Sequence, residues 1–146
     1  MAAFCLLTSF PQKVEAAEYW PEGPTVEGEA AIVMEASTGT VLYEKNADEQ
    51  LYPASITKIM TALLAVENSS MDEQVTFSMD AVYKTEGSGI SRDVDEVMSM
   101  KDCLYGLMLE SSNECAYAIA EHVGGTYDNF VQMMNEKAAE LGCTHT

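Results

Sequence analysis

Ser55-Ile56-Thr57-Lys58 places a hydroxyl and an amine three residues apart at the start of an apolar segment. If that segment is a helix, both side chains share one face, and the Lys58 amine can reach the Ser55 hydroxyl. A serine hydroxyl is a weak nucleophile until a base removes its proton, and a lysine can be that base only where burial lowers its pKa. The tetrad therefore indicates acyl transfer with Ser55 as nucleophile and Lys58 as general base. By itself it also fits an ordinary helix start with a surface lysine.

The segment that follows the tetrad favours the catalytic interpretation. Pro53 suits the first turn of a helix, and the apolar residues beyond it recur at helical spacing. They are Ile56, Ile59, Met60, Leu63 and Val66, and Ala62 and Leu64 occupy the other faces. A helix that is apolar nearly all round is normally buried. We therefore expect a buried helix that leaves Lys58 no polar face on which to lie.

A second element, Ser111-Ser112-Asn113, lies in a break between two predicted helices. Serine and asparagine are also the residues preferred at a helix N-cap, so the tripeptide alone would indicate only a cap. Its combination with the tetrad is more specific than either pattern alone.

The remaining pattern predicts an α+β protein with a hairpin, one further short strand and four helices. The strands are expected at residues 30–34, 41–43 and 74–77, and the helices at 55–66, 99–108, 114–123 and 126–141. Ser99 and Thr126 are in position to cap the N-termini of two helices, and Gly125 and Gly142 follow the ends of two. Two strands make a poor sheet by themselves, and the chain ends just past a helix, so we expect an interrupted domain.

These stretches resemble the D-alanyl-D-alanine carboxypeptidases, the low-molecular-weight penicillin-binding proteins, and the resemblance implies a β-lactamase/transpeptidase-like fold. Besides the two motifs it includes residues 36–46, 53–61 and 104–113, and it extends over about residues 29–146.

The resemblance implies a role for each site residue. Ser55 would attack the carbonyl between two terminal D-alanines and form an acyl-enzyme, with Lys58 as base. Ser111 would relay a proton to the leaving D-alanine, and Asn113 would hold the substrate amide and orient Lys58. The implied partners are peptidoglycan stem peptides that end in D-Ala-D-Ala, and β-lactam antibiotics as inhibitors that acylate Ser55. No cofactor is implied.

One element of the family pattern is absent, namely a Lys-Thr-Gly or close variant on a later strand. The nearest string, Lys84-Thr85-Glu86-Gly87, has an extra residue and precedes Ser111. We therefore expect a catalytic domain that stops before its remaining sheet strands. The 146-residue chain is expected to be inactive or barely folded, although its parent is an enzyme.

Two alternatives stay open. A serine β-lactamase shares the tetrad, but the class A pattern has Ser-Asp-Asn where this chain has Ser111-Ser112-Asn113. A non-catalytic protein that binds penicillin or wall peptide would explain the missing third motif. A Lys-Thr-Gly strand further along the reading frame would favour the enzyme.

Charge and the N-terminus limit partners and location. The net charge of −17 argues against nucleic acid as a partner, and the four cysteines and two histidines do not follow a metal-binding spacing. An apolar stretch closed by Pro11 and the small residues before Glu18 favour a partial secretory signal peptide at 1–17. Residues 18–28 then form a linker or extended arm, and 29–146 an incomplete catalytic domain. We expect an exported protein, extracellular or periplasmic, whose full-length parent associates with the cell wall or the membrane periphery.

Overall fold

The computed structural model describes residues 23–144 and 146 and divides the chain into two compact units, 1–49 and 50–146. The predicted signal peptide, residues 1–17, and most of the predicted arm lie outside the described residues. Residues 23–28 contain no helix or strand. No helix within the described residues is both long and apolar enough to cross a bilayer.

The first unit contains the predicted hairpin. Strand β1 (Ala31–Met34) pairs antiparallel with β2 (Val41–Lys45), and Val33 lies opposite Tyr43. In the turn between them the Glu35 carboxylate accepts hydrogen bonds from the Thr38 hydroxyl and from the Ser37 amide, and these bonds lower its pKa to about 2. The expectation of a hairpin with a polar turn is confirmed.

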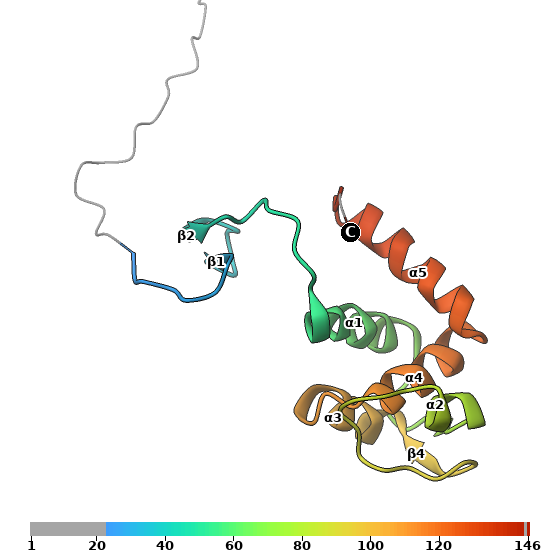
Figure 1. Ribbon diagram of the computed structural model, residues 1–146. Coiled ribbons are helices and arrows are strands. Elements are labelled where there is room, and N and C mark those ends of the chain that lie inside the picture. The colour runs from blue at the N-terminus through green and yellow to red at the C-terminus, as the bar shows by residue number, and fades with distance from the viewer. Residues whose placement is uncertain (1–22, 145) are drawn as a thin grey trace, which may run out of the picture. The chain divides into compact units, whose positions relative to one another are not determined.

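The second unit is built around α4 (Asn113–Gly124), as Figure 1 shows. This helix contacts α1 (Lys58–Asn68), α2 (Met79–Tyr83), α3 (Met100–Leu109) and α5 (Tyr127–Glu140). Cys115, Ala118 and Ile119 share one face of α4 by their spacing, and all three are fully buried. The core therefore lies around α4, and it also contains Ala65, Val75, Phe77, Ala81, Met100, Cys103 and Leu107.

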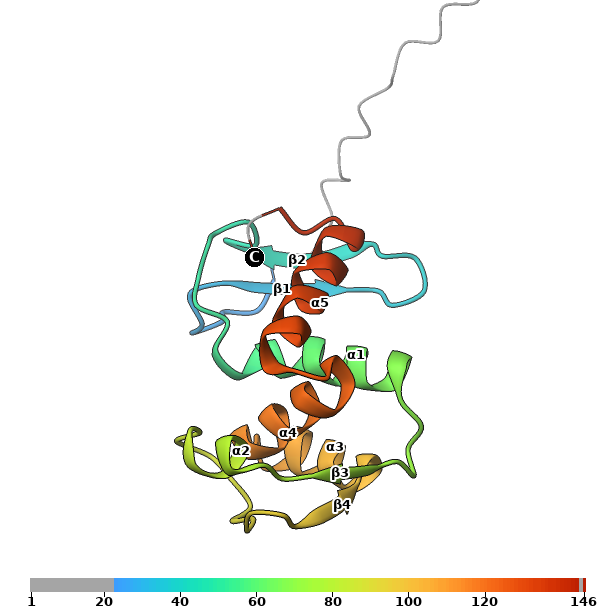
Figure 2. The ribbon, with the colours of Figure 1, turned by 90° about the vertical axis from the view of Figure 1, so that its right-hand side faces the viewer.

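A two-stranded ribbon lies beside these helices, as Figure 2 shows. Strand β3 (Gln74–Thr76) pairs antiparallel with β4 (Val97–Ser99). The first of these was predicted, but β4 and the short helix α2 were not. The five residues of α2 are little more than one helical turn, too few to show a helical period.

The predicted caps are present. The Ser99 hydroxyl accepts the amide of Asp102 at 3.1 Å and begins α3. The Thr126 hydroxyl accepts the amide of Asn129 at 3.1 Å and begins α5. Gly125 ends α4 with a φ of 73°, a conformation that glycine adopts without strain.

The expected burial of the tetrad helix was wrong in part. A 3-10 turn (Ala54–Thr57) precedes α1, and within the second unit Ile56, Ile59 and Val66 are 68%, 59% and 59% exposed. Leu64 and Ala65 are buried. The helices of this unit that contact α1 are α3, α4 and α5, so its opposite face is left uncovered there.

Phe130 packs α5 against α1 and α4. It is 1% exposed and lies in a buried cluster with Leu64 of α1 and Ala120 of α4. Phe130→Ala should lower the free energy of unfolding by about 3–5 kcal/mol, since it leaves a cavity. Urea denaturation followed by circular dichroism measures this loss. The neighbouring Val131→Ala, at a side chain 36% exposed, should change stability by less than about 1 kcal/mol. Equal losses in the two variants would contradict the packing described.

Candidate active site

The four residues selected from the sequence lie together in the second unit. Ser55 is in the 3-10 turn and Lys58 is the first residue of α1. Ser111 lies in the turn between α3 and α4, and Asn113 is the first residue of α4. Two helix N-termini therefore bring the tetrad and the tripeptide to one place.

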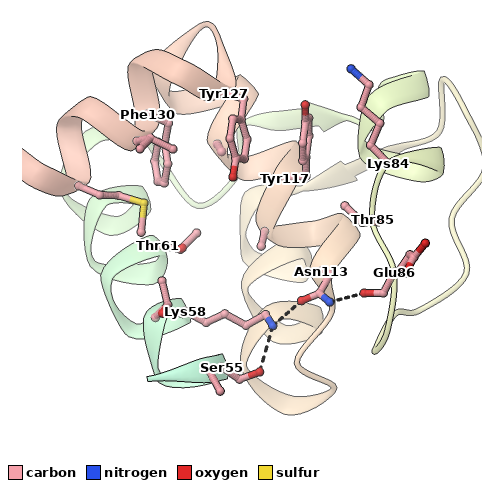
Figure 3. Close-up of a pocket in the computed structure, with 16 residues that line it drawn as sticks. Ser55, Lys58, Thr61, Lys84, Thr85, Glu86, Asn113, Tyr117, Tyr127 and Phe130 are labelled. Carbon is pink, nitrogen blue, oxygen red and sulfur yellow. Dashed lines mark hydrogen bonds between the residues drawn. The ribbon is translucent and has the colours of Figure 1, made fainter. Parts of the chain in front are cut away.

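The Lys58 amine is the centre of this group (Figure 3). Its Nζ lies 3.3 Å from Ser55 Oγ, 3.1 Å from Ser111 Oγ and 2.6 Å from Asn113 Oδ1. The side chain is 9% exposed, and desolvation lowers its pKa below the usual value for lysine. Burial disfavours the ammonium form, so the neutral amine needed for proton abstraction becomes more accessible.

The two serine hydroxyls are also in direct contact. Ser111 Oγ donates to Ser55 Oγ at 3.0 Å, so both hydroxyls and the Lys58 amine form a closed triangle of hydrogen bonds. A proton can pass along any side of this triangle without a large movement of heavy atoms. The arrangement can activate Ser55 as a nucleophile and return a proton through Ser111.

The backbone at this turn has an uncommon conformation. Ser111 has a φ of 55°, in the left-handed region that costs a non-glycine residue about 1–2 kcal/mol. The next residue, Ser112, is fully buried; its N–H donates to the Gly106 carbonyl at 3.1 Å and its Oγ accepts the Cys115 amide at 3.1 Å. Ser112 is thus the N-cap of α4, and its neighbours on either side contact Lys58. Within the tripeptide, Ser112 is therefore the helix cap, whereas Ser111 and Asn113 are the residues beside the Lys58 amine.

Sequence reasoning missed a contribution from the loop before β4. The Glu86 carbonyl accepts a hydrogen bond from Asn113 Nδ2 at 2.5 Å, and the Ser88 carbonyl accepts one from the Asn113 amide at 2.8 Å. From the sequence, this segment shows only an imperfect Lys-Thr-Gly string. The nearby glycines Gly87 and Gly89 were the available signal, because close approach of a backbone often requires glycine.

A cavity of about 520 Å³ adjoins Lys58. Two of its lining residues, Tyr117 and Tyr127, stack with ring centroids 4.7 Å apart. Phe130 and Met134 line the same cavity. A bound molecule that touches Ser55 could therefore extend onto an aromatic surface. Among the described residues, no group of three or more His, Cys, Asp or Glu side chains is placed to hold a metal ion.

Comparison with known proteins gives one consistent family. Residues 16–146 match the family model described as D-alanyl-D-alanine carboxypeptidase. The chain is 40% identical over 126 residues to the D-alanyl-D-alanine carboxypeptidase DacF of Bacillus subtilis, covering 82% of this chain and 32% of that protein. It is 36% identical over 157 residues to DacC of Escherichia coli, covering 99% of this chain and 39% of that protein.

Solved structures agree with the sequence comparison. The D-alanyl-D-alanine carboxypeptidase DacD from Francisella tularensis superposes with a TM-score of 0.80 at 33% identity, covering 86% of this chain and 32% of that one. Penicillin binding protein 5 from Haemophilus influenzae gives a TM-score of 0.78 at 28% identity, covering 86% and 39%. The predicted transpeptidase-like fold is confirmed. The chain spans about a third of the length of the curated relatives it matches.

The buried amine should be visible in a titration. Lys58 should titrate below the usual lysine pKa of about 10.4, whereas Lys84, which pairs with Asp80, should titrate above it. The ¹³Cε chemical shifts of both residues followed against pH test this order. A Lys58 titration at or above the usual value would contradict its desolvation.

The same shift has a consequence for stability. In the pH range between the lowered pKa of Lys58 and the usual lysine value, the unfolded chain binds a proton that the folded chain has lost. The free energy of unfolding contributed by this residue should therefore rise with pH across that range. Lys58→Met should remove this rise when wild type and variant are denatured in parallel at several pH values.

Proposed function

This chain belongs to the D-alanyl-D-alanine carboxypeptidase family, and on that basis we propose that it supplies the acylation centre of a serine-type D-Ala-D-Ala carboxypeptidase. The observation that supports this function is the buried Lys58 amine within hydrogen-bond distance of Ser55, Ser111 and Asn113. Because the chain spans about a third of its relatives' length, the proposal concerns the full-length product of the gene.

In the proposed reaction, the neutral Lys58 amine takes the Ser55 proton as Ser55 Oγ attacks the carbonyl carbon between the two D-alanines. The tetrahedral intermediate collapses when the C–N bond breaks. The proton on Lys58 passes through the Ser111 hydroxyl to the leaving D-alanine amine. The Ser55 ester is then hydrolysed by water, which releases the shortened peptide and restores the Ser55 hydroxyl.

The remaining residues act by position. Asn113 Oδ1 accepts from Lys58 Nζ and so holds the amine beside both hydroxyls. The Asn113 side chain also lies in the lining of the cavity, where it can bond the amide of a stem peptide. β-Lactams carry a strained amide in place of the D-Ala-D-Ala bond, so they acylate Ser55. The ester that they form on Ser55 is hydrolysed slowly.

Location and domain boundaries belong to the same proposal. Residues 1–17 serve as a partial signal peptide, 18–28 as an arm and 29–146 as part of the catalytic domain. The protein is exported to the periplasm or the cell exterior, where its substrate, peptidoglycan, is found. The full-length parent associates peripherally with the membrane and acts in cell-wall and cell-shape maintenance.

A fluorescent penicillin tests the assignment of the nucleophile and the base. The full-length product should be labelled at Ser55, which peptide mapping by mass spectrometry can locate. Ser55→Ala should abolish the label, and Lys58→Ala should slow acylation by about 10²–10⁴-fold, because general base catalysis is lost. Ser70→Ala, at an exposed serine in the turn after α1, is the matched control and should label like wild type.

Two further assays separate the carboxypeptidase from its alternatives. A carboxypeptidase should release D-alanine from a peptide ending in D-Ala-D-Ala and should turn over nitrocefin slowly. Rapid nitrocefin turnover without D-alanine release would instead favour the β-lactamase. Retention of the peptide with no product of either kind would favour a binding protein. Penicillin labelling that persists in Ser55→Ala would overturn the assigned nucleophile.

A further inference from the structure

The loop of residues 86–92 is attached to the first turn of α4 by a carboxylate that the mechanism above does not use. Glu114 Oε1 accepts the backbone N–H of Ile90 at 2.7 Å and that of Arg92 at 3.3 Å. The Arg92 guanidinium pairs with Glu96 at 2.7 Å. The contact between Glu114 and the loop is therefore made through backbone amides, which are fixed in direction.

The loop approaches α4 so closely that side chains would interfere. A Cβ on Gly89 would lie 2.8 Å from Glu114 Oε2, and one on Gly87, whose φ is 91°, would lie 3.2 Å from Asn113 Nδ2. The Ile90 side chain reaches α3, where a Cβ on Gly106 would lie 3.1 Å from Ile90 Cδ1. The segment is thus held by a polar contact on α4 and an apolar contact on α3.

This attachment decides which end of the Asn113 amide faces Lys58. Two loop carbonyls meet Asn113, that of Ser88 at its backbone N–H and that of Glu86 at its Nδ2. With Nδ2 engaged by a carbonyl, Oδ1 is the atom directed at Lys58 Nζ, 2.6 Å away (Figure 3). An amide turned by 180° would place N–H groups against the amine and an oxygen against the Glu86 carbonyl, so both hydrogen bonds would be lost.

We propose that Glu114 is a positioning residue that holds the 86–92 loop in place and thereby fixes the orientation of the Asn113 amide toward Lys58. Glu114 acts through the loop and touches none of the groups that react. That this orientation matters for acylation of Ser55 rests on the proposed function. The orientation itself is a property of the folded chain and can be measured without any substrate.

Nuclear magnetic resonance of the ¹⁵N-labelled chain tests the orientation directly. In the wild type, the Asn113 side-chain NH₂ protons and the amides of Ile90 and Arg92 should exchange slowly with solvent. In Glu114→Ala the Ile90 and Arg92 amides should exchange at least about tenfold faster, because they lose their carboxylate acceptor. The Asn113 NH₂ protons should follow, because the Glu86 carbonyl that accepts from Nδ2 is no longer held in place. Glu114→Gln should keep most of the protection, because its amide oxygen can accept the same two N–H groups.

Matched variants separate this effect from a general loss of structure. Glu110→Ala removes an exposed glutamate near the same turn and should leave the Asn113 signals unchanged. Gly89→Ala disturbs the contact from the loop side and should accelerate Asn113 exchange as Glu114→Ala does. Gly28→Ala, whose added Cβ meets its nearest atom at an ordinary 3.4 Å, is the control for it. If Glu114→Ala does not fold, Gly89→Ala decides the question.

The outcomes are distinct. Unchanged Asn113 NH₂ exchange in a folded variant that has lost protection at Ile90 and Arg92 would overturn the inference.

A parallel measurement of penicillin acylation on the full-length product separates the two proposals. If the wild type is not acylated, the proposed function fails while the exchange data still decide the role of Glu114. If it is acylated, Glu114→Ala should be acylated about tenfold more slowly, which corresponds to a loss of about 1.4 kcal/mol in transition-state stabilisation. Equal acylation rates in the wild type and in Glu114→Ala would show that Glu114 does not influence Lys58.

Discussion

A lysine amine held largely out of water beside two hydroxyls and an amide oxygen is the constraint on which the second unit depends. Removing a cation from water is unfavourable unless its donors are satisfied. The Lys58 ammonium has three N–H donors and three acceptors, on Ser55, Ser111 and Asn113. Those acceptors come from the 3-10 turn before α1, the turn between α3 and α4, and the first residue of α4. The packing of α1 against α4 is therefore also what makes burial of the amine tolerable.

The turn that presents Ser111 is held in a conformation that an isolated chain would avoid. A positive φ at a serine persists only where the surroundings determine it, and strain of this kind often occurs at functional sites. Here the surroundings are the buried Ser112, bonded on both sides, and the Cys115 face of α4 in the core. The core of the second unit thus stabilises a backbone geometry that has its use at Lys58. Ala54, directly before Ser55, also has a positive φ, of 46°, although this residue is exposed.

The sequence predicted the features that depend on residue type at short spacing. The tetrad, the tripeptide and the caps at Ser99 and Thr126 each follow from neighbours within one helical turn, and the structure brings the two motifs together. The uncovered face of α1 could not be predicted, because apolar periodicity does not say which elements are present to cover it. The loop at Glu86 was missed for a different reason. It contributes backbone carbonyls, which every residue has, so no side-chain pattern marks them.

Asn113 Oδ1 can only accept a hydrogen bond, and this limits where the N–H groups and the lone pair of Lys58 can point. A neutral lysine amine has two N–H donors and one lone pair. If one N–H is committed to Asn113 Oδ1, the other N–H and the lone pair face Ser55 and Ser111. The hydrogen bond from Ser111 Oγ to Ser55 Oγ uses the only proton on Ser111, so Ser55 is the hydroxyl left to donate to the lone pair. In the neutral form the bond from Ser111 to Ser55, added to the three contacts of Lys58, leaves Ser55 as the hydroxyl that donates to the amine. The orientation of the Asn113 amide therefore limits how the Lys58 N–H groups and lone pair can be placed against the two serine hydroxyls.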